Sequence, residues 1–135
     1  TIPTSIGWFS ELSNLRLSSN KLMGSIPWTV KRMTSLQILH MADNQLSGPL
    51  PNELGDLKVL RELDLSFNNL TGTIPESFGE LKNMETLNLL RNRLEGVVPE
   101  SLCEIFDDSQ DRKLFVNDEP TSIQVTCACC DEVVP

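Results

Sequence analysis

The chain has 135 residues, 39% of them hydrophobic, which is enough for the core of one ordinary domain and too few for two independent ones. Its formal net charge of -8 and its sequence pI of about 4.5 argue against nucleic acids and anionic membrane surfaces as partners, because binding phosphates requires clustered Lys and Arg. No run of about 18 apolar residues predicts a membrane span, and the first residues lack the basic and apolar regions of a signal peptide.

A 24-residue repeat runs through the chain, in which asparagine, glycine and proline each recur with the same step. The three series are Asn20, Asn44, Asn68 and Asn92; Gly24, Gly48, Gly72 and Gly96; and Pro3, Pro27, Pro51, Pro75 and Pro99. A fixed period of this length predicts a solenoid, in which each repeat forms one coil and the coils stack on one another.

Each of these asparagines follows a pair of apolar residues that are separated by one other residue. The pairs are Leu15 and Leu17, Leu39 and Met41, Leu63 and Leu65, and Leu87 and Leu89. Alternation with a period of two predicts a short strand whose apolar residues point inward and whose intervening residues point outward. Stacking then places the strands side by side in a parallel sheet, at a spacing of about 4.8 Å.

The recurring polar and special residues each have a task in such a coil. Because the chain must bend after its strand, backbone N–H and C=O groups face the core, where an inward Asn amide can satisfy both kinds. One Asn per coil therefore predicts a ladder of hydrogen bonds. The recurrent Gly permits a positive φ or a close approach of neighbouring coils, and the Pro begins a segment where a free N–H would lack a partner.

The segment LRELDLSFNNLTGTIPESFGEL, from Leu60 to Leu81, resembles the plant-type leucine-rich repeat, whose pattern is LxxLxxLxLxxNxLxGxIPxxLGxL. This resemblance implies an α/β solenoid with a right-handed superhelix, a parallel β-sheet on the concave face and short helical or 3-10 segments on the convex side. The segments SLCEIF, KLFVNDEP and VTCACC are similar to the C-terminal caps of secreted-type leucine-rich-repeat proteins of diatoms and related algae.

The period slips near the C-terminal end, where Leu114 lies 27 residues after Leu87 and Glu119 takes the ladder position of the next Asn. We therefore expect leucine-rich repeats over residues 1–106, with four Asn-bearing coils after the tail of a preceding one. An irregular capping segment over residues 107–135 follows, since the terminal coil of a solenoid must cover the open end of the core.

All four cysteines lie at this end of the chain: Cys103, Cys127, Cys129 and Cys130. Their spacing lacks the paired CxxC units of a structural zinc site, so we expect disulfides that staple the cap. Disulfides imply a secretory or extracellular location, or another oxidising compartment such as an organelle lumen. Four cysteines allow three connectivities, and the sequence does not choose among them.

The N-terminal end begins inside a coil, which predicts an exposed apolar edge. Its residues are Ile2, Ile6, Trp8, Phe9 and Leu12. We expect upstream repeats to cover this edge, with a neighbouring subunit as the alternative.

Outward residues of successive strands form columns on the concave face, where solenoids commonly bind their partners. Aromatic and Arg side chains tend to carry interface energy, and they mark the predicted binding patch. The patch comprises Arg16, His40, Asp64, Asn88, Ile38, Glu62, Phe67, Asp43 and Arg91. The alternatives are a merely solvated sheet face, contact through convex or edge surfaces, and a convex hot spot at Trp28.

The one histidine, His40, lies one rung from Asp64 and near serines, which superficially supplies a hydrolytic trio. A flat sheet offers these groups no pocket and no oxyanion hole, so we predict no catalytic residue and no enzyme activity. The acidic residues from Glu104 to Asp111 lack the spaced oxygen ligands and the Gly of a calcium loop. We expect no metal and no cofactor.

These observations predict a non-catalytic recognition or scaffold module that binds a protein or a peptide, as a subunit or an ectodomain fragment of a larger assembly. A carbohydrate-binding or cell-wall protein is the alternative, disfavoured because the chain has no Tyr and the concave columns hold one aromatic residue, Phe67. A rigid spacer is a third possibility. Asn69-Leu70-Thr71 is an N-glycosylation sequon, although the repeat consensus generates it by itself.

Overall fold

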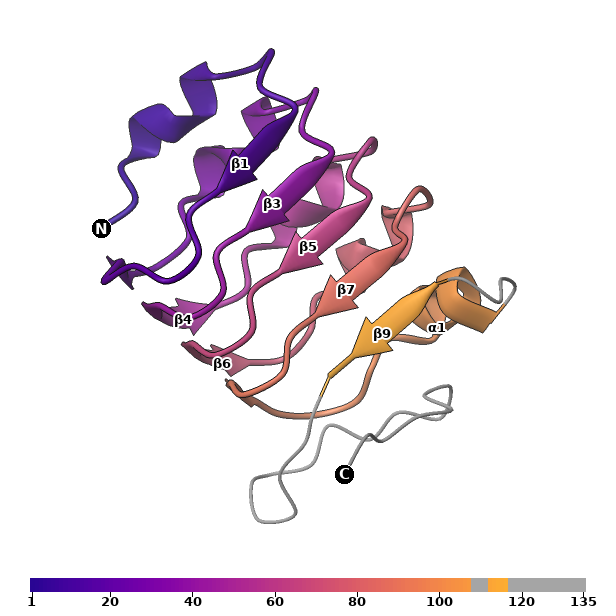
Figure 1. Cartoon of the computed structure of the whole chain (residues 1–135). Coiled ribbons are helices and arrows are strands. Elements are labelled where there is room, and N and C mark those ends of the chain that lie inside the picture. Colours follow the sequence, from indigo (N-terminus) through magenta and orange to yellow (C-terminus); the bar gives the residue numbers. More distant parts are fainter. Residues whose placement is uncertain (108–111, 117–135) are drawn as a thin grey trace.

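The computed structural model describes residues 1–107 and 112–116. Five short strands form a parallel sheet in the order β1-β3-β5-β7-β9, so that each coil adds one strand beside the previous one. The strands are β1 (Asn14–Arg16), β3 (Ile38–His40), β5 (Glu62–Asp64), β7 (Thr86–Asn88) and β9 (Lys113–Phe115). Figure 1 shows this sheet on one side of the stack and the helical segments on the other, which confirms the predicted α/β solenoid.

The register of the sheet places the strand leucines in one line. Leu39 pairs with Leu63, Leu63 with Leu87, and Leu87 with Leu114. The last step is 27 residues because α1 (Glu100–Asp107) has eight residues where the preceding helical segment, η4 (Glu76–Glu80), has five. A longer helix therefore absorbs the predicted slip, and the strand register is kept.

Short 3-10 helices form the side of the first four coils that lies opposite the concave sheet, and each begins directly after a repeat proline. They are η1 (Thr4–Trp8), η2 (Trp28–Arg32), η3 (Asn52–Asp56) and η4. The proline carbonyl accepts a hydrogen bond from the residue three positions on, as in Val30 N–H to Pro27 C=O at 3.1 Å. The fixed φ of proline thus starts each segment where the sequence predicted it.

A second parallel sheet lies between the strands and the helical segments of successive coils. Its order is β2-β4-β6-β8, and its strands are β2 (Met23–Gly24), β4 (Gln45–Pro49), β6 (Asn69–Gly72) and β8 (Arg93–Leu94). The repeat glycines lie in these strands or shortly after them and have a positive φ, 79° at Gly48. A positive φ is one of the two roles predicted for these glycines. The sheet itself was not predicted, because runs of two to five residues are too short for alternation to indicate a strand.

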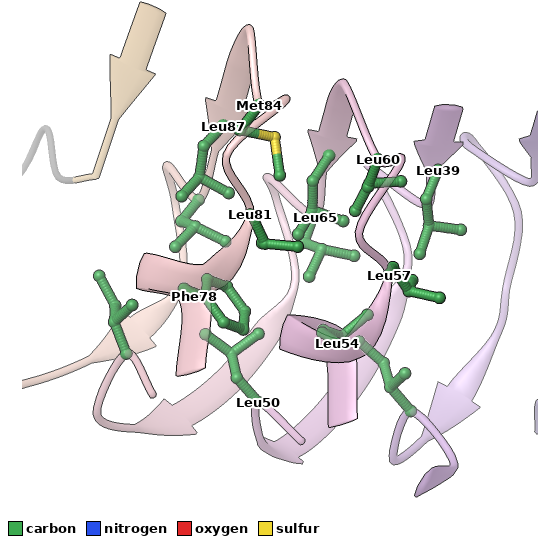
Figure 2. Close-up of a cluster of buried hydrophobic side chains, with 14 of the residues drawn as sticks. Leu39, Leu50, Leu54, Leu57, Leu60, Leu65, Phe78, Leu81, Met84 and Leu87 are labelled. Atoms are coloured by element: carbon green, nitrogen blue, oxygen red, sulfur yellow. The ribbon is translucent and has the colours of Figure 1, made fainter. Parts of the chain in front are cut away.

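Leucines from both sides of the coil meet in one continuous core. Leu39 and Leu87 reach it from strands, and Leu54 and Phe78 reach it from 3-10 helices; all four are fully buried (Figure 2). Each such side chain contributes about 1.5–3 kcal/mol through burial of apolar surface. The stack is therefore held by contacts between neighbouring coils.

Close packing on the helical side explains one set of glycines. A Cβ atom built on Gly55 would collide with the carbonyl oxygen of Ser77 in the next coil. Cys103, which stands at the equivalent position near the end of the stack, is buried within α1. Glycine at this position, which is not one of the series predicted to permit close approach, allows the two coils to pack together.

The N-terminal edge differs in part from the prediction. Trp8 and Phe9 are exposed, by 78% and 58%, and Ile6 and Leu12 are half-buried, but Ile2 is buried at 7%. Ile2 occupies the same repeat position as Ile26, and both belong to the core, so its side chain points into the stack rather than outward. The expectation of an exposed Ile2 was therefore wrong.

Candidate binding surface

The asparagine ladder fixes the backbone on which the concave columns stand. Asn68 donates from Nδ2 to the carbonyls of Leu65, Ser66 and, in the preceding coil, Met41, at 3.0 to 3.2 Å. Its Oδ1 accepts from the N–H of Leu46 at 2.9 Å. These are the core-facing groups that the bend leaves without partners, so the predicted hydrogen bonds are present.

The same bonds recur at Asn44 and Asn92, whereas Asn20 in the first coil bonds only to its own coil, at Leu17 and Ser18. The ladder therefore couples each coil to the one before it from the second coil onward. This coupling holds adjacent strands in register and keeps their outward side chains at constant spacing.

Residues directly before the ladder asparagines adopt a left-handed backbone. Ser19, Asp43, Phe67 and Arg91 have φ between 54° and 57°. At Phe67 the neighbouring coils enforce this conformation, because its N–H donates to Leu90 C=O at 2.9 Å and its C=O accepts from Asn44 N–H at 3.2 Å. A bulky residue in this region costs about 1–2 kcal/mol, and the inter-coil hydrogen bonds offset that cost.

The left-handed turn also presents the side chain of Phe67 to solvent. It is 57% exposed although it is a large apolar residue. Asp43 and Arg91, at the same turn of the flanking coils, are exposed as well. These residues occupy equivalent turns of successive coils, and nothing in their types signals a positive φ, which is usual for Gly and Asn.

The strand columns lie in the predicted register. Arg16 pairs with His40, His40 with Asp64, and Asp64 with Asn88. The structure extends this column by Phe115 and the neighbouring one by Lys113, both on β9. These two residues are not among the predicted patch residues, although the spacing of Leu114 from Leu87 contained the signal for them.

Charges on the sheet are partly paired across the columns. His40 Nε2 lies 3.0 Å from Glu62 Oε2, and both side chains are partly exposed. Asp64 accepts hydrogen bonds from the hydroxyl of Ser66 at 2.7 Å and from its N–H at 3.0 Å. Arg16, at the N-terminal end of the column, is exposed. The surface thus offers a cation at one end and carboxylates in the middle.

The geometry does not assemble the superficial hydrolytic trio. His40 has Glu62 as its carboxylate partner, whereas Asp64 is bonded to Ser66. Ser18 Oγ accepts from the N–H of Ala42 at 3.1 Å. Because the three kinds of group bond to different partners, proton transfer from serine to histidine to aspartate has no path here.

Two further findings concern the described part of the chain alone. In residues 1–107 and 112–116 no three His, Cys, Asp or Glu side chains gather as a metal site would require. Within the same ranges, no helix is long and apolar enough to cross a membrane.

The remaining predicted site residues lie away from the concave columns. Asn69 is exposed on β6, and Trp28 is 48% exposed on η2. Cys103 is disulfide-bonded, while Cys127, Cys129 and Cys130 lie outside the described residues, as does Glu119. The capping segment with its Cys cluster and the division at residue 106 therefore stay as predictions, and the disulfide connectivity stays open.

Comparison with known proteins identifies the repeat. The family model for the leucine rich repeat matches residues 10–70 and 58–105, which is more than half of the chain. The chain belongs to the leucine-rich-repeat family. A search of curated proteins found no match.

Solved structures show which branch of the leucine-rich-repeat family the chain is similar to. The plant peptide hormone receptor RGFR1, solved in complex with RGF2, is 33% identical, with a TM-score of 0.79 over 87% of this chain and 19% of that one. The leucine-rich-repeat ectodomain of the receptor kinase SOBIR1 from Arabidopsis thaliana is 32% identical, with a TM-score of 0.77 over 86% of this chain and 62% of that one. These likenesses support the plant type of repeat.

A third likeness is to the BIR3 and SERK2 complex from Arabidopsis thaliana, at 32% identity and a TM-score of 0.72, covering 90% of this chain and 65% of that one. The chain thus spans less than two thirds of each of these relatives. The carbohydrate alternative finds no support among these three, since the two solved as complexes are named with a peptide or protein partner. The resemblance of the C-terminal segments to algal caps stays a prediction.

Proposed function

We propose that the chain recognises an extended peptide, or a flexible segment of a protein, on the concave columns of its sheet. The observation that carries this proposal is Phe67, whose ring is 57% exposed in a left-handed turn that the neighbouring coils enforce. An exposed aromatic ring on a rigid backbone loses little entropy when it is covered, and such rings dominate interface energies.

The charges of the columns define the ligand further. Arg16 lies on β1, the first strand of the sheet, and favours an acidic group of the ligand beside that strand. Glu62 and Asp43 favour a basic group of the ligand beside them. Phe67 lies one coil beyond Asp43 and favours an apolar side chain there. The expected ligand is therefore a short segment that carries an acidic, a basic and an apolar residue.

Relatives support the class of ligand and the location. RGFR1 is named as a peptide hormone receptor in complex with RGF2, and the SOBIR1 structure is an ectodomain. We extend both properties to this chain as a proposal: it acts outside the cell, without catalysis and without a cofactor. The disulfide at Cys103 supports an oxidising location.

A displayed peptide library tests this function. Peptides are selected on the immobilised chain, and their affinities are measured for the chain and for Phe67→Ala and Arg16→Ala variants. We expect the selected peptides to lose about tenfold in affinity with each variant. Glu76→Gln on the convex side is the matched control and should leave the affinity unchanged. Peptides that bind the control and both variants equally well would place recognition elsewhere.

A further inference from the structure

The convex side carries two rows of exposed residues whose chemistry changes along the stack. One residue of each row comes from each helical segment, because equivalent positions in neighbouring coils lie one above the other. The first row is Thr4, Trp28, Asn52, Glu76 and Glu100, and the second is Trp8, Arg32, Asp56, Glu80 and Glu104; all ten are exposed. The first two coils are therefore aromatic and basic, and the later coils are acidic.

Within the first two coils, two cations lie over one ring. Lys31 Nζ is 5.2 Å from the centroid of the Trp28 ring, and Arg32 Cζ is 5.4 Å from it. Trp8 is 78% exposed on η1, which packs directly against η2, and its equivalents in coils with neighbours on both sides, Arg32, Asp56 and Glu80, are exposed as well. We name Trp8, Trp28, Lys31 and Arg32 the aromatic-basic patch.

Two cations of the following coils are paired with carboxylates, unlike those of the patch. Lys58 is paired with Glu80 at 3.6 Å, and Arg61 with Glu85. Among the described residues, no carboxylate lies within ion-pair distance of Lys31 or Arg32. The patch therefore keeps two positive charges available on a chain whose net charge is -8.

We propose that the aromatic-basic patch binds an acidic peptide segment of a partner protein. The two cations attract its carboxylates, and the exposed rings of Trp8 and Trp28 cover its apolar groups, a combination that carries binding energy at interfaces. The acidic residues of the later coils repel such a segment and confine it to the first two coils. Two cations are too few for a polyphosphate chain, which needs many released counterions for affinity.

This surface lies on the opposite side of the coil from the concave columns, so it is a second site that is independent of the function proposed above. Its two tryptophans are the only ones in the chain, which makes tryptophan fluorescence a direct measure of its occupancy. A partner could then be held on both faces of the same coils.

The experiment titrates the chain with an end-blocked peptide of six glutamates and two phenylalanines and follows tryptophan fluorescence. We expect a saturable change that weakens at high salt, because the screening length falls from about 10 Å at 0.1 M to about 3 Å at 1 M. The double variant Lys31→Glu with Arg32→Glu should lower the affinity at least about tenfold. Trp28→Ala should also lower it, measured by calorimetry because one fluorophore is lost.

A matched control alters the net charge by the same amount elsewhere. Lys82→Glu with Arg93→Glu replaces one exposed Lys and one exposed Arg away from the patch and should keep at least half of the affinity. Equal loss in both double variants would show that only the overall charge matters and would overturn the proposal. A fluorescence change with polygalacturonate but none with the peptide would also overturn it, as would concentration-dependent self-association through the patch in sedimentation.

Discussion

Asn68 shows how one buried side chain ties two coils together. It makes four hydrogen bonds while only 8% exposed, and two of them reach the preceding coil. Asn68→Ala leaves buried backbone groups without partners, so we expect it to lower the free energy of unfolding by about 3 kcal/mol, measured by urea denaturation.

Two other asparagines provide the controls for this measurement. Asn69→Ala removes an exposed neighbour and should change the stability by less than about 0.5 kcal/mol. Asn20→Ala, which breaks two bonds within its own coil, should cost about 1 kcal/mol. Similar losses at Asn20 and Asn68 would contradict coupling between coils as the source of the effect.

Phe67 has a strained backbone and an exposed side chain, so a substitution there can raise the stability of the fold while it lowers the affinity for a ligand. Phe67→Asn places a residue that tolerates φ near 54° where little apolar burial is lost. We expect the unfolding free energy to rise by about 0.5 kcal/mol, while affinity for selected peptides falls. A loss of stability together with unchanged binding would show that the ring serves the fold instead.

Residue roles that depend only on spacing were predictable. The Asn ladder, the inward leucines and the column of Arg16, His40 and Asp64 all follow from the 24-residue step. The left-handed turn at Phe67 and the pairing of His40 with Glu62 were not, because both arise from contacts between coils that no single repeat contains.

At the scale of elements, glycine serves two different purposes, close packing of coils at Gly55 on the helical side and a positive φ at Gly48 in β4. Gly55→Ala would push a methyl group into the backbone of η4, and we expect a loss of about 2–3 kcal/mol in stability. Gly48→Ala makes an ordinary van der Waals contact, 3.7 Å from Ser25 Cβ, so only the φ of 79° is unfavourable, which should cost about 1 kcal/mol. Thermal unfolding of the two variants checks the order, and a larger cost at Gly48 would contradict it.

The N-glycosylation sequon lies on strand β6, where its asparagine and its threonine are both accessible. Asn69 and Thr71 are both exposed, while Leu70 between them is fully buried, so the two lie on the outer side of the strand. We propose that Asn69 is glycosylated when the chain passes through a eukaryotic secretory route. The intact mass should then exceed the sequence mass, and Asn69→Gln or Thr71→Ala should remove the difference; an unmodified wild-type mass contradicts the proposal.

Strand and helix positions were predictable from the proline and leucine steps, and their exact extents were not. The second sheet, β2 to β8, forms because successive coils bring short extended pieces together, and its members are too short for their alternation to indicate a strand. Phe115 and Lys113 were missed for another reason, because they join the concave columns only after α1 has taken up three extra residues.

For the whole molecule, the first coil is held less firmly than the third coil, which lies in the middle of the stack. Leu65 is fully buried and its N–H donates to Asn88 C=O, while Leu17 in the first coil is half-buried and its N–H donates to His40 C=O. Because each coil of a solenoid is stabilised by its neighbours, we expect the Leu65 amide to exchange hydrogen about 100-fold more slowly than that of Leu17. Equal protection would indicate that the first coil unfolds together with the rest.

The parallel register of the concave sheet also sets a length scale for any ligand laid across it. Strands are about 4.8 Å apart, whereas an extended peptide advances about 3.3 Å per residue. The distance across two coils therefore matches the length of about three ligand residues. Four intervals between five strands then measure about 19 Å, the span of about six residues. Coils two apart would therefore meet ligand residues that are three apart and whose side chains point to opposite faces, whereas coils four apart would meet residues that are six apart on the same face.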